Sequence, residues 1–172
     1  MGDIGILRAA VEGLATSPAR KAALLRHIWR PARFRALLDR FAARLPQTQA
    51  RSALIARLQS APPEVLIAQA GPLIGLRTED EIEARIMALR EDANQPPIPA
   101  AEAEALDAVL QVAGDAVSAL TTLQGLAADL PPISAAVSRL ARRLDALDAH
   151  GIDVTALAFE ASHGRDSMEY YD

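Results

Sequence analysis

Eleven prolines divide this chain of 172 residues into short blocks. Proline is accepted in the first turn of a helix but not in its interior. Ser17-Pro18 has the form of a helix start, with a hydroxyl at the N-cap and proline at the first helical position. The residue before Pro31 avoids helical backbone angles, so one helix is expected to end there and another to begin. This spacing predicts seven or eight short helices.

Hydrophobic residues recur at helical spacing within these blocks, which predicts amphipathic helices. The stripes fall at Phe34, Leu37, Leu38, Phe41 and Leu45, at Leu54, Ile55 and Leu58, at Ile82, Ile86 and Leu89, and at Val137, Leu140, Leu144 and Leu147. Thr78 and Glu81 have the spacing of a capping box, and Gly151 is placed to end the helix expected over 133–150. The stretch 100–130 is expected to be helical with interruptions near Gly114 and Gly125.

The pattern changes after Gly151. Leu157, Phe159 and Ala161 alternate with more polar or smaller residues, which predicts a strand. The first residues, "MGDIGIL", could be a strand end that turns into a helix. The predicted fold is mainly α: a bundle of short helices with one or two strands near the termini.

The residue types exclude several kinds of site. The chain has no cysteine, and its three histidines (His27, His150 and His163) lack the spacing of metal ligands. No phosphate-binding loop, dinucleotide-binding loop or nucleophile elbow is present. We therefore expect no metal, no cofactor and no catalytic residues. No leader and no apolar run of membrane-spanning length is visible, which predicts a cytoplasmic protein that does not enter a membrane.

"NQPPIP" at 94–99 has the composition of a linker. It would separate a basic helical half (1–93) from a second part (100–172) that leads into the strand. Residues 1–61 carry 11 of the 18 basic residues and three of the 22 acids, a net charge of +8, whereas the rest of the chain carries −12. A solvated arginine-rich face, or two halves that face each other, is the favoured interpretation; an anionic partner is the alternative. Nucleic acid is disfavoured, because Phe34 and Phe41 belong to an apolar stripe.

The chain closes with "HGRDSMEYYD", which contains its only two tyrosines. An arginine can hold a carboxylate or phosphate through two hydrogen bonds, and tyrosine and glutamate can recognise an amine or imidazole. Arg165, Glu169, Tyr170 and Tyr171 are therefore candidates for binding a small zwitterion. A solvated tail is the alternative.

"LDALDAHGIDVTALAFEASHGRDSMEYYD" (144–172) resembles the segment of class II histidyl-tRNA synthetases that carries their histidine-binding signature. Together with "MGDIGILRAAVEGL" (1–14), it resembles most the synthetase-like regulatory subunits of ATP phosphoribosyltransferase. "RPARFRALLDRFA" is similar in character to their helical insert. The chain departs from the signature in one respect: its tyrosines follow Arg165 by five and six positions rather than four and five.

The resemblance implies remnants of a class II synthetase-like sheet near the termini and an internal fragment whose ends need pairing with each other or with another chain. It also implies a non-enzymatic regulatory subunit of histidine biosynthesis that forms a hetero-oligomer with the catalytic phosphoribosyltransferase, with histidine as effector. Arg165, Glu169, Tyr170 and Tyr171 would bind histidine. The alternatives are a fragment of an active histidyl-tRNA synthetase and a helical protein-interaction module.

Overall fold

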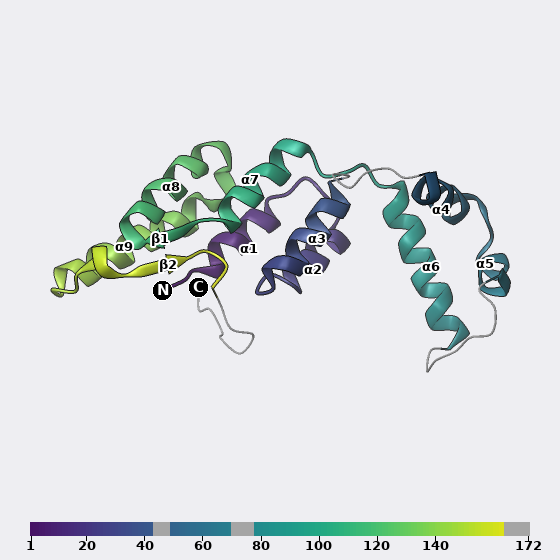
Figure 1. Ribbon diagram of the computed structural model, residues 1–172, viewed down its shortest axis with the longest axis horizontal. Helices are drawn as coiled ribbons and strands as arrows, with labels where there is room; N and C mark the ends of the chain where they lie inside the picture. Colours follow the sequence, from purple (N-terminus) through teal and green to yellow (C-terminus); the bar gives the residue numbers. More distant parts are fainter. Residues whose placement is uncertain (43–48, 70–77, 164–172) are drawn as a thin grey trace. The chain divides into compact units, whose positions relative to one another are not determined.

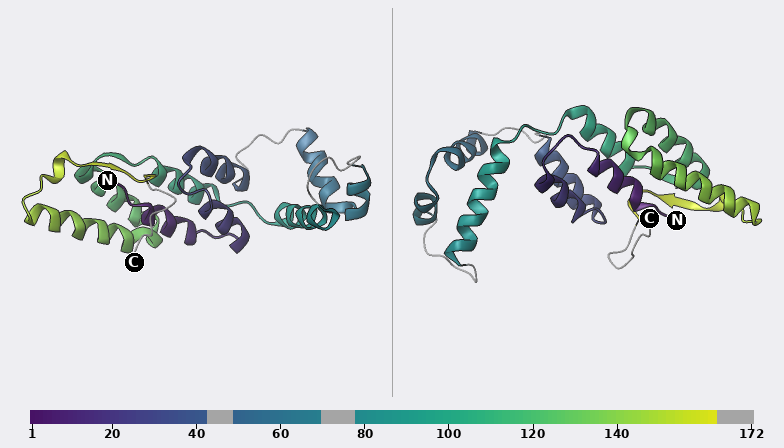
Figure 2. Two further views of the ribbon diagram at one scale, coloured as in Figure 1. Left: turned by 90° about the horizontal axis from the view of Figure 1, so that it is seen from below. Right: turned by 180° about the vertical axis from the view of Figure 1, so that it is seen from behind.

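The computed structural model describes residues 1–42, 49–69 and 78–163, and these residues are mainly helical (Figures 1 and 2). The chain forms two compact units, of which unit 1 comprises Met1–Arg44 and Pro97–Asp172 and unit 2 comprises Leu45–Pro96. Unit 1 contains α1 (Ile4–Glu12), α2 (Pro18–Leu25), α3 (Pro31–Phe41), α7 (Ala100–Leu110), β1 (Ala113–Asp115), α8 (Ala116–Asp129), α9 (Ser134–Ala149), β2 (Ala158–Glu160) and the 3-10 turns η1 (Pro131–Ile133) and η2 (Val154–Ala156). Unit 2 contains α4 (Gln49–Ser60), α5 (Pro63–Gln69) and α6 (Glu79–Asn94).

The two units divide the chain differently from the predicted boundary at 94–99. Residues 1–44 group with 97–172 rather than with the rest of 1–93. The reason is burial: Ile98, inside the predicted linker, is only 1% exposed, and its N–H donates to the carbonyl of Phe41 at 2.9 Å. Part of the proline-rich stretch therefore belongs to the core of unit 1.

Most predicted helix boundaries are confirmed where the chain is described, but the helix expected to end at Pro31 ends earlier, at Leu25. The Ser17 hydroxyl accepts a hydrogen bond from the Arg20 N–H, and Pro31 begins α3. Thr78 and Glu81 form both hydrogen bonds of the capping box. Gly151 has a φ of +79°, a left-handed conformation that glycine adopts at little steric cost. These features depend on residues three or four positions apart.

The hydrophobic core lies in unit 1, which holds every buried hydrophobic side chain among the described residues. Phe34 and Leu38 of α3 are fully buried, as the stripe predicted, and so is Leu140 of α9. Helix α1 buries residues on several sides, since Ile6, Leu7, Ala10 and Val11 are all inaccessible to solvent. Helix α1 therefore lies at the centre of the unit.

The stripe of Leu54, Ile55 and Leu58 predicts that these side chains point inward, which is wrong for Leu54, because its exposed fraction is 55%. Ile55 and Leu58 of the same helix are only half-buried. The described residues of unit 2 form α4, α5 and α6, and none of their described side chains is fully buried. Arg90 of α6 holds part of the unit together: its guanidinium donates to the carbonyl of Leu58 at 2.6 Å and to that of Ala61.

The strand predicted after Gly151 is confirmed as β2, with Phe159 buried between exposed neighbours. Its partner β1 lies in the stretch predicted as an interrupted helix. The two strands pair antiparallel, with Gly114 opposite Phe159. Gly114 has a φ of +136°, so the chain leaves helical geometry at this position, whereas Gly125 lies within α8 and interrupts nothing. The relation to a class II synthetase sheet stays a prediction.

Candidate functional site

The predicted ligand residues Arg165, Glu169, Tyr170 and Tyr171 lie outside the described residues. The structure does describe the chain that leads to them, through β2 and on to His163. It also describes the elements packed against that segment. These elements form the candidate site region.

The start of the chain lies along one edge of β2. In an antiparallel strand, successive residues direct their backbone groups to opposite edges. The backbone of Phe159 pairs with β1. On the other edge, the carbonyl of Ala158 accepts from the Met1 amino group at 2.6 Å, and the N–H of Glu160 donates to the Met1 carbonyl at 3.0 Å. The N-terminus accordingly lies next to β2 in Figure 1. β2 is thus held on both edges, although Met1 itself is not part of an assigned strand.

Gly2 allows this close approach. A Cβ placed on Gly2 would lie 2.6 Å from both the Cβ and the carbonyl oxygen of His163, and 2.9 Å from the carbonyl oxygen of Glu160. Real Cβ atoms essentially never approach other atoms this closely. A residue without a side chain is therefore needed here if the backbone is to keep its position.

Asp3 is buried to 8% exposure and has two roles. One carboxylate oxygen accepts from the Gly5 N–H at 3.1 Å, which caps α1, and the other lies 3.4 Å from an Arg143 nitrogen on α9. Arg143 is about half exposed, with a side-chain exposure of 49%. Asp3 therefore connects the start of α1 to α9 beside β2.

Polar groups lie close together at the end of β2, just before the predicted ligand motif. The Ser162 hydroxyl, which is nearly buried, donates to the Glu160 carboxylate at 2.8 Å. His163 follows and is exposed. A carboxylate that accepts and an imidazole that donates or accepts could both contact a polar ligand. This arrangement supplies recognition groups; no activated nucleophile is evident among the described residues.

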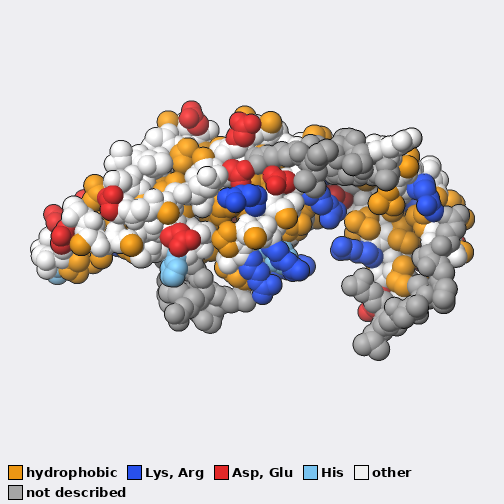
Figure 3. Space-filling view, in the orientation of Figure 1, with side chains coloured by type: hydrophobic (Ala, Val, Ile, Leu, Met, Phe, Trp, Pro, Cys, Tyr) orange, Lys and Arg blue, Asp and Glu red, His pale blue; other side chains and the backbone are white. Residues whose placement is uncertain are grey.

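A second surface feature lies over α2 and α3, where Figure 3 shows Lys and Arg side chains gathered. A shallow depression of about 330 Å³ is lined by His27, Arg33, Ala36, Leu37 and Arg40. Arg20 and Arg40 lie over the ring of Phe41, at 5.2 and 5.7 Å from its centre. Arg35 pairs with Asp107 of α7 at 3.5 Å. Some of the basic side chains thus make contacts within unit 1, and some line an open surface.

His150 lies at the C-terminal end of α9, where its Nδ1 is 2.7 Å from the Ala146 carbonyl. Across 1–42, 49–69 and 78–163, no three side chains are grouped as metal ligands.

The carboxyl groups of Asp115 and Asp153 have lowered pKa values, because the Ser118 N–H stabilises the first and the Thr155 hydroxyl stabilises the second. Both are capping groups on the surface and not part of a reactive cluster.

Sequence reasoning did not single out Gly2, Asp3 or Arg143 as site-region residues. Asp3 could have been found as an N-cap, because an acid precedes a run of apolar helix formers. The approach of Gly2 to His163 and the pairing of Asp3 with Arg143 join residues 161 and 140 positions apart. No local pattern carries that information.

Comparisons of the chain with protein-family models, with curated proteins and with solved structures find no match. Among the described helices, none has the length and apolar character needed to cross a membrane.

Proposed function

We propose that the protein is a non-catalytic regulatory subunit of ATP phosphoribosyltransferase that supports the catalytic subunit and transmits feedback by histidine. The main support is that the two segments which carry the resemblance lie together. Residues 1–14 contact the described part of 144–172 through Met1 with β2 and through Gly2 with His163, and Asp3 pairs with Arg143, the residue just before that segment. Two segments that build one site in a family are expected to be neighbours in space.

In this proposal, β2 leads into the ligand-binding motif. Tyr170 and Tyr171 would contact the imidazole of histidine, with Glu169 beside them, and Arg165 would contact a carboxylate or phosphate. The extra residue between Arg165 and the tyrosines makes the two tyrosines the stronger assignment. Asp166, next to Arg165, places a negative charge where an ATP phosphate would be repelled. That fits a protein that does not activate histidine.

The proposal is tested by titrating histidine, calorimetrically, into the complex of this protein with the catalytic subunit. The double variant Tyr170→Phe/Tyr171→Phe should lose histidine binding and feedback inhibition, because both hydroxyls are removed while the rings stay. Glu104→Gln, on the exposed surface of α7, is the control and should leave both unchanged. An unchanged affinity in the double variant would leave the tyrosines without a role in binding, as expected of a helical interaction module.

A second candidate is an active histidyl-tRNA synthetase, and the basic surface over α2 and α3 favours it. Contacts to tRNA phosphates would make affinity fall steeply with salt concentration. Attachment of histidine to tRNA by the protein that carries this chain would decide for the synthetase and against the regulatory subunit. We place it second because Phe34 and Phe41 are buried and Trp29 is half-buried, so these rings are not presented for stacking on bases.

A further inference from the structure

Two exposed helix faces of this chain have complementary patterns. On α3, Arg33, Leu37 and Arg40 follow one another at intervals of one turn, with Ala36 beside them. On α6, Glu83, Met87 and Glu91 do the same, with Ala84 and Ala88 beside them. Each face therefore has an apolar middle between two like charges, and the charges of the two faces are opposite.

The spacings also agree. Arg33 and Arg40 are seven residues apart, about 10.5 Å along a helix, and Glu83 and Glu91 are eight apart, about 12 Å. Long arginine side chains can span the difference. The residues around each face carry a net charge of the same sign as its two rim residues. Residues 18–42 contain seven basic residues and one acid, whereas α6 contains six acids and two arginines.

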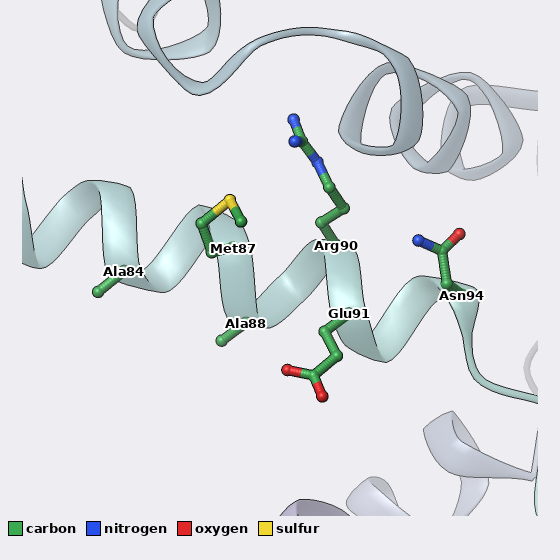
Figure 4. A pocket seen from close by; sticks show the side chains of 6 residues that line it. All are labelled: Ala84, Met87, Ala88, Arg90, Glu91 and Asn94. Atoms are coloured by element: carbon green, nitrogen blue, oxygen red, sulfur yellow. The ribbon is translucent and has the colours of Figure 1, made fainter.

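The α6 face is not covered within the part of the chain that the structure describes. Met87 is 48% exposed and Ala84, Ala88, Glu83 and Glu91 are exposed. A depression of about 510 Å³ lies along it, and the described residues that line it belong to α6: Ala84, Met87, Ala88, Arg90, Glu91 and Asn94 (Figure 4). Because Arg90 reaches the carbonyls of Leu58 and Ala61, it fixes α6 to α4 while the Met87 face stays open.

The α3 face is open in the same way. Arg33, Ala36 and Arg40 are exposed and Leu37 is half-buried at the floor of the depression. So shallow a surface would not bury most of a small ligand, as ligand pockets do. It suits a helix laid along it, with apolar side chains in the middle and charges at the rim.

We propose that α6 of a second copy of this chain docks on α3, with Met87 against Leu37 and Ala36, and with Glu83 and Glu91 against the two arginines. Methionine adapts readily to such a surface. In a two-fold dimer each copy offers its α6 to the other, so the contact forms twice and the assembly closes. This inference is independent of the proposed function.

The test is sedimentation equilibrium of the chain, with a charge exchange between the two faces. The wild type should form a dimer that weakens as salt rises, because the rim charges are exposed. Arg33→Glu/Arg40→Glu and Glu83→Arg/Glu91→Arg should each weaken the homodimer about 10- to 100-fold, since four exposed charge pairs per dimer become repulsive. An equimolar mixture of the two variants should recover dimer, because both of its contacts are then complementary.

Arg139→Glu/Arg142→Glu on the exposed side of α9 makes the same change in net charge and should leave the dimer unaffected. Circular dichroism of every variant checks that the helices are retained. The proposal is overturned if the wild type stays monomeric at several hundred micromolar, which would leave both faces to other proteins. It is equally overturned if the α3 variant dimerises like the wild type, or if the mixture dimerises no better than its components.

Discussion

An Arg143 guanidinium nitrogen lies 3.4 Å from the Asp3 carboxylate, joining α9 to the start of α1 across 140 positions of sequence. The carboxylate is almost buried, whereas the arginine is half exposed. The same carboxylate caps α1 through the Gly5 N–H. Asp3 therefore combines a local role and a tertiary role, which substitution can separate.

Asp3→Ala removes both roles and should lower the free energy of unfolding by about 0.5–2 kcal/mol, the usual effect of losing an N-cap. Asp3→Asn should have a smaller effect, because asparagine caps about as well and only the charge pair is lost. Such half-exposed pairs contribute about 0.2–1 kcal/mol. Chemical denaturation in a double-mutant cycle with Arg143→Leu measures this coupling. Equal effects of Asp3→Ala and Asp3→Asn would contradict the capping role.

Gly2→Ala should destabilise the contact between the N-terminal segment and β2, because the new methyl group would overlap His163 and the Glu160 carbonyl. Overpacking of this kind costs about 1–3 kcal/mol unless the segment moves away. Both overpacking and movement of the segment should speed hydrogen exchange of the Glu160 amide, which donates to the Met1 carbonyl.

Gly125→Ala is the matched control, because the residue is inside α8 and, apart from its chain neighbours and the surrounding helix backbone, no atom lies within 4 Å of its added Cβ. Alanine should stabilise this helix by about 0.5–1 kcal/mol relative to glycine. Protection of the Glu160 amide in Gly2→Ala equal to that in the wild type would show that the close approach does not matter.

Leu140→Ala should lower the free energy of unfolding by about 2–5 kcal/mol, because this side chain is fully buried in unit 1. Leu54→Ala makes the same chemical change at a side chain that is 55% exposed, and should change stability by less than about 0.5 kcal/mol. Thermal unfolding followed by circular dichroism compares the two. A large loss in Leu54→Ala would support the inward orientation that the sequence predicted.

The carboxyl groups of Asp115 and Asp153 make stability depend on acid pH. Their pKa values in the folded chain lie below the ordinary 3.8, because the Ser118 N–H and the Thr155 hydroxyl stabilise the charged forms. The stabilisation is therefore complete above the unfolded pKa and is lost as pH falls through the lowered folded values. Asp115→Asn/Asp153→Asn should flatten the fall in stability below about pH 4, measured by urea denaturation from pH 7 to pH 3. A curve parallel to that of the wild type would contradict this assignment.

The candidate site could be predicted from sequence only as a set of residues. Arg165, Glu169, Tyr170 and Tyr171 stand out by type, but they lie outside the described part of the chain, so their geometry stays a prediction. Phe159 was predicted correctly as a strand residue, since alternation is a local signal. The strand paired with it could not be predicted, because Gly114 reads as a helix interruption until its distant partner is known.

The sequence by itself determined the local features: helix starts at Ser17-Pro18 and Pro31, the capping box of Thr78 with Glu81, and the helix end at Gly151. Each is satisfied by groups within a few residues, so local chemistry is sufficient. Only the tertiary structure decided that residues 1–44 pack with 97–172 and that Leu54 faces solvent. It also decided that Met1 and β1 bond to opposite edges of β2. Burial and strand pairing depend on which distant surfaces meet, and that is a property of the folded chain as a whole.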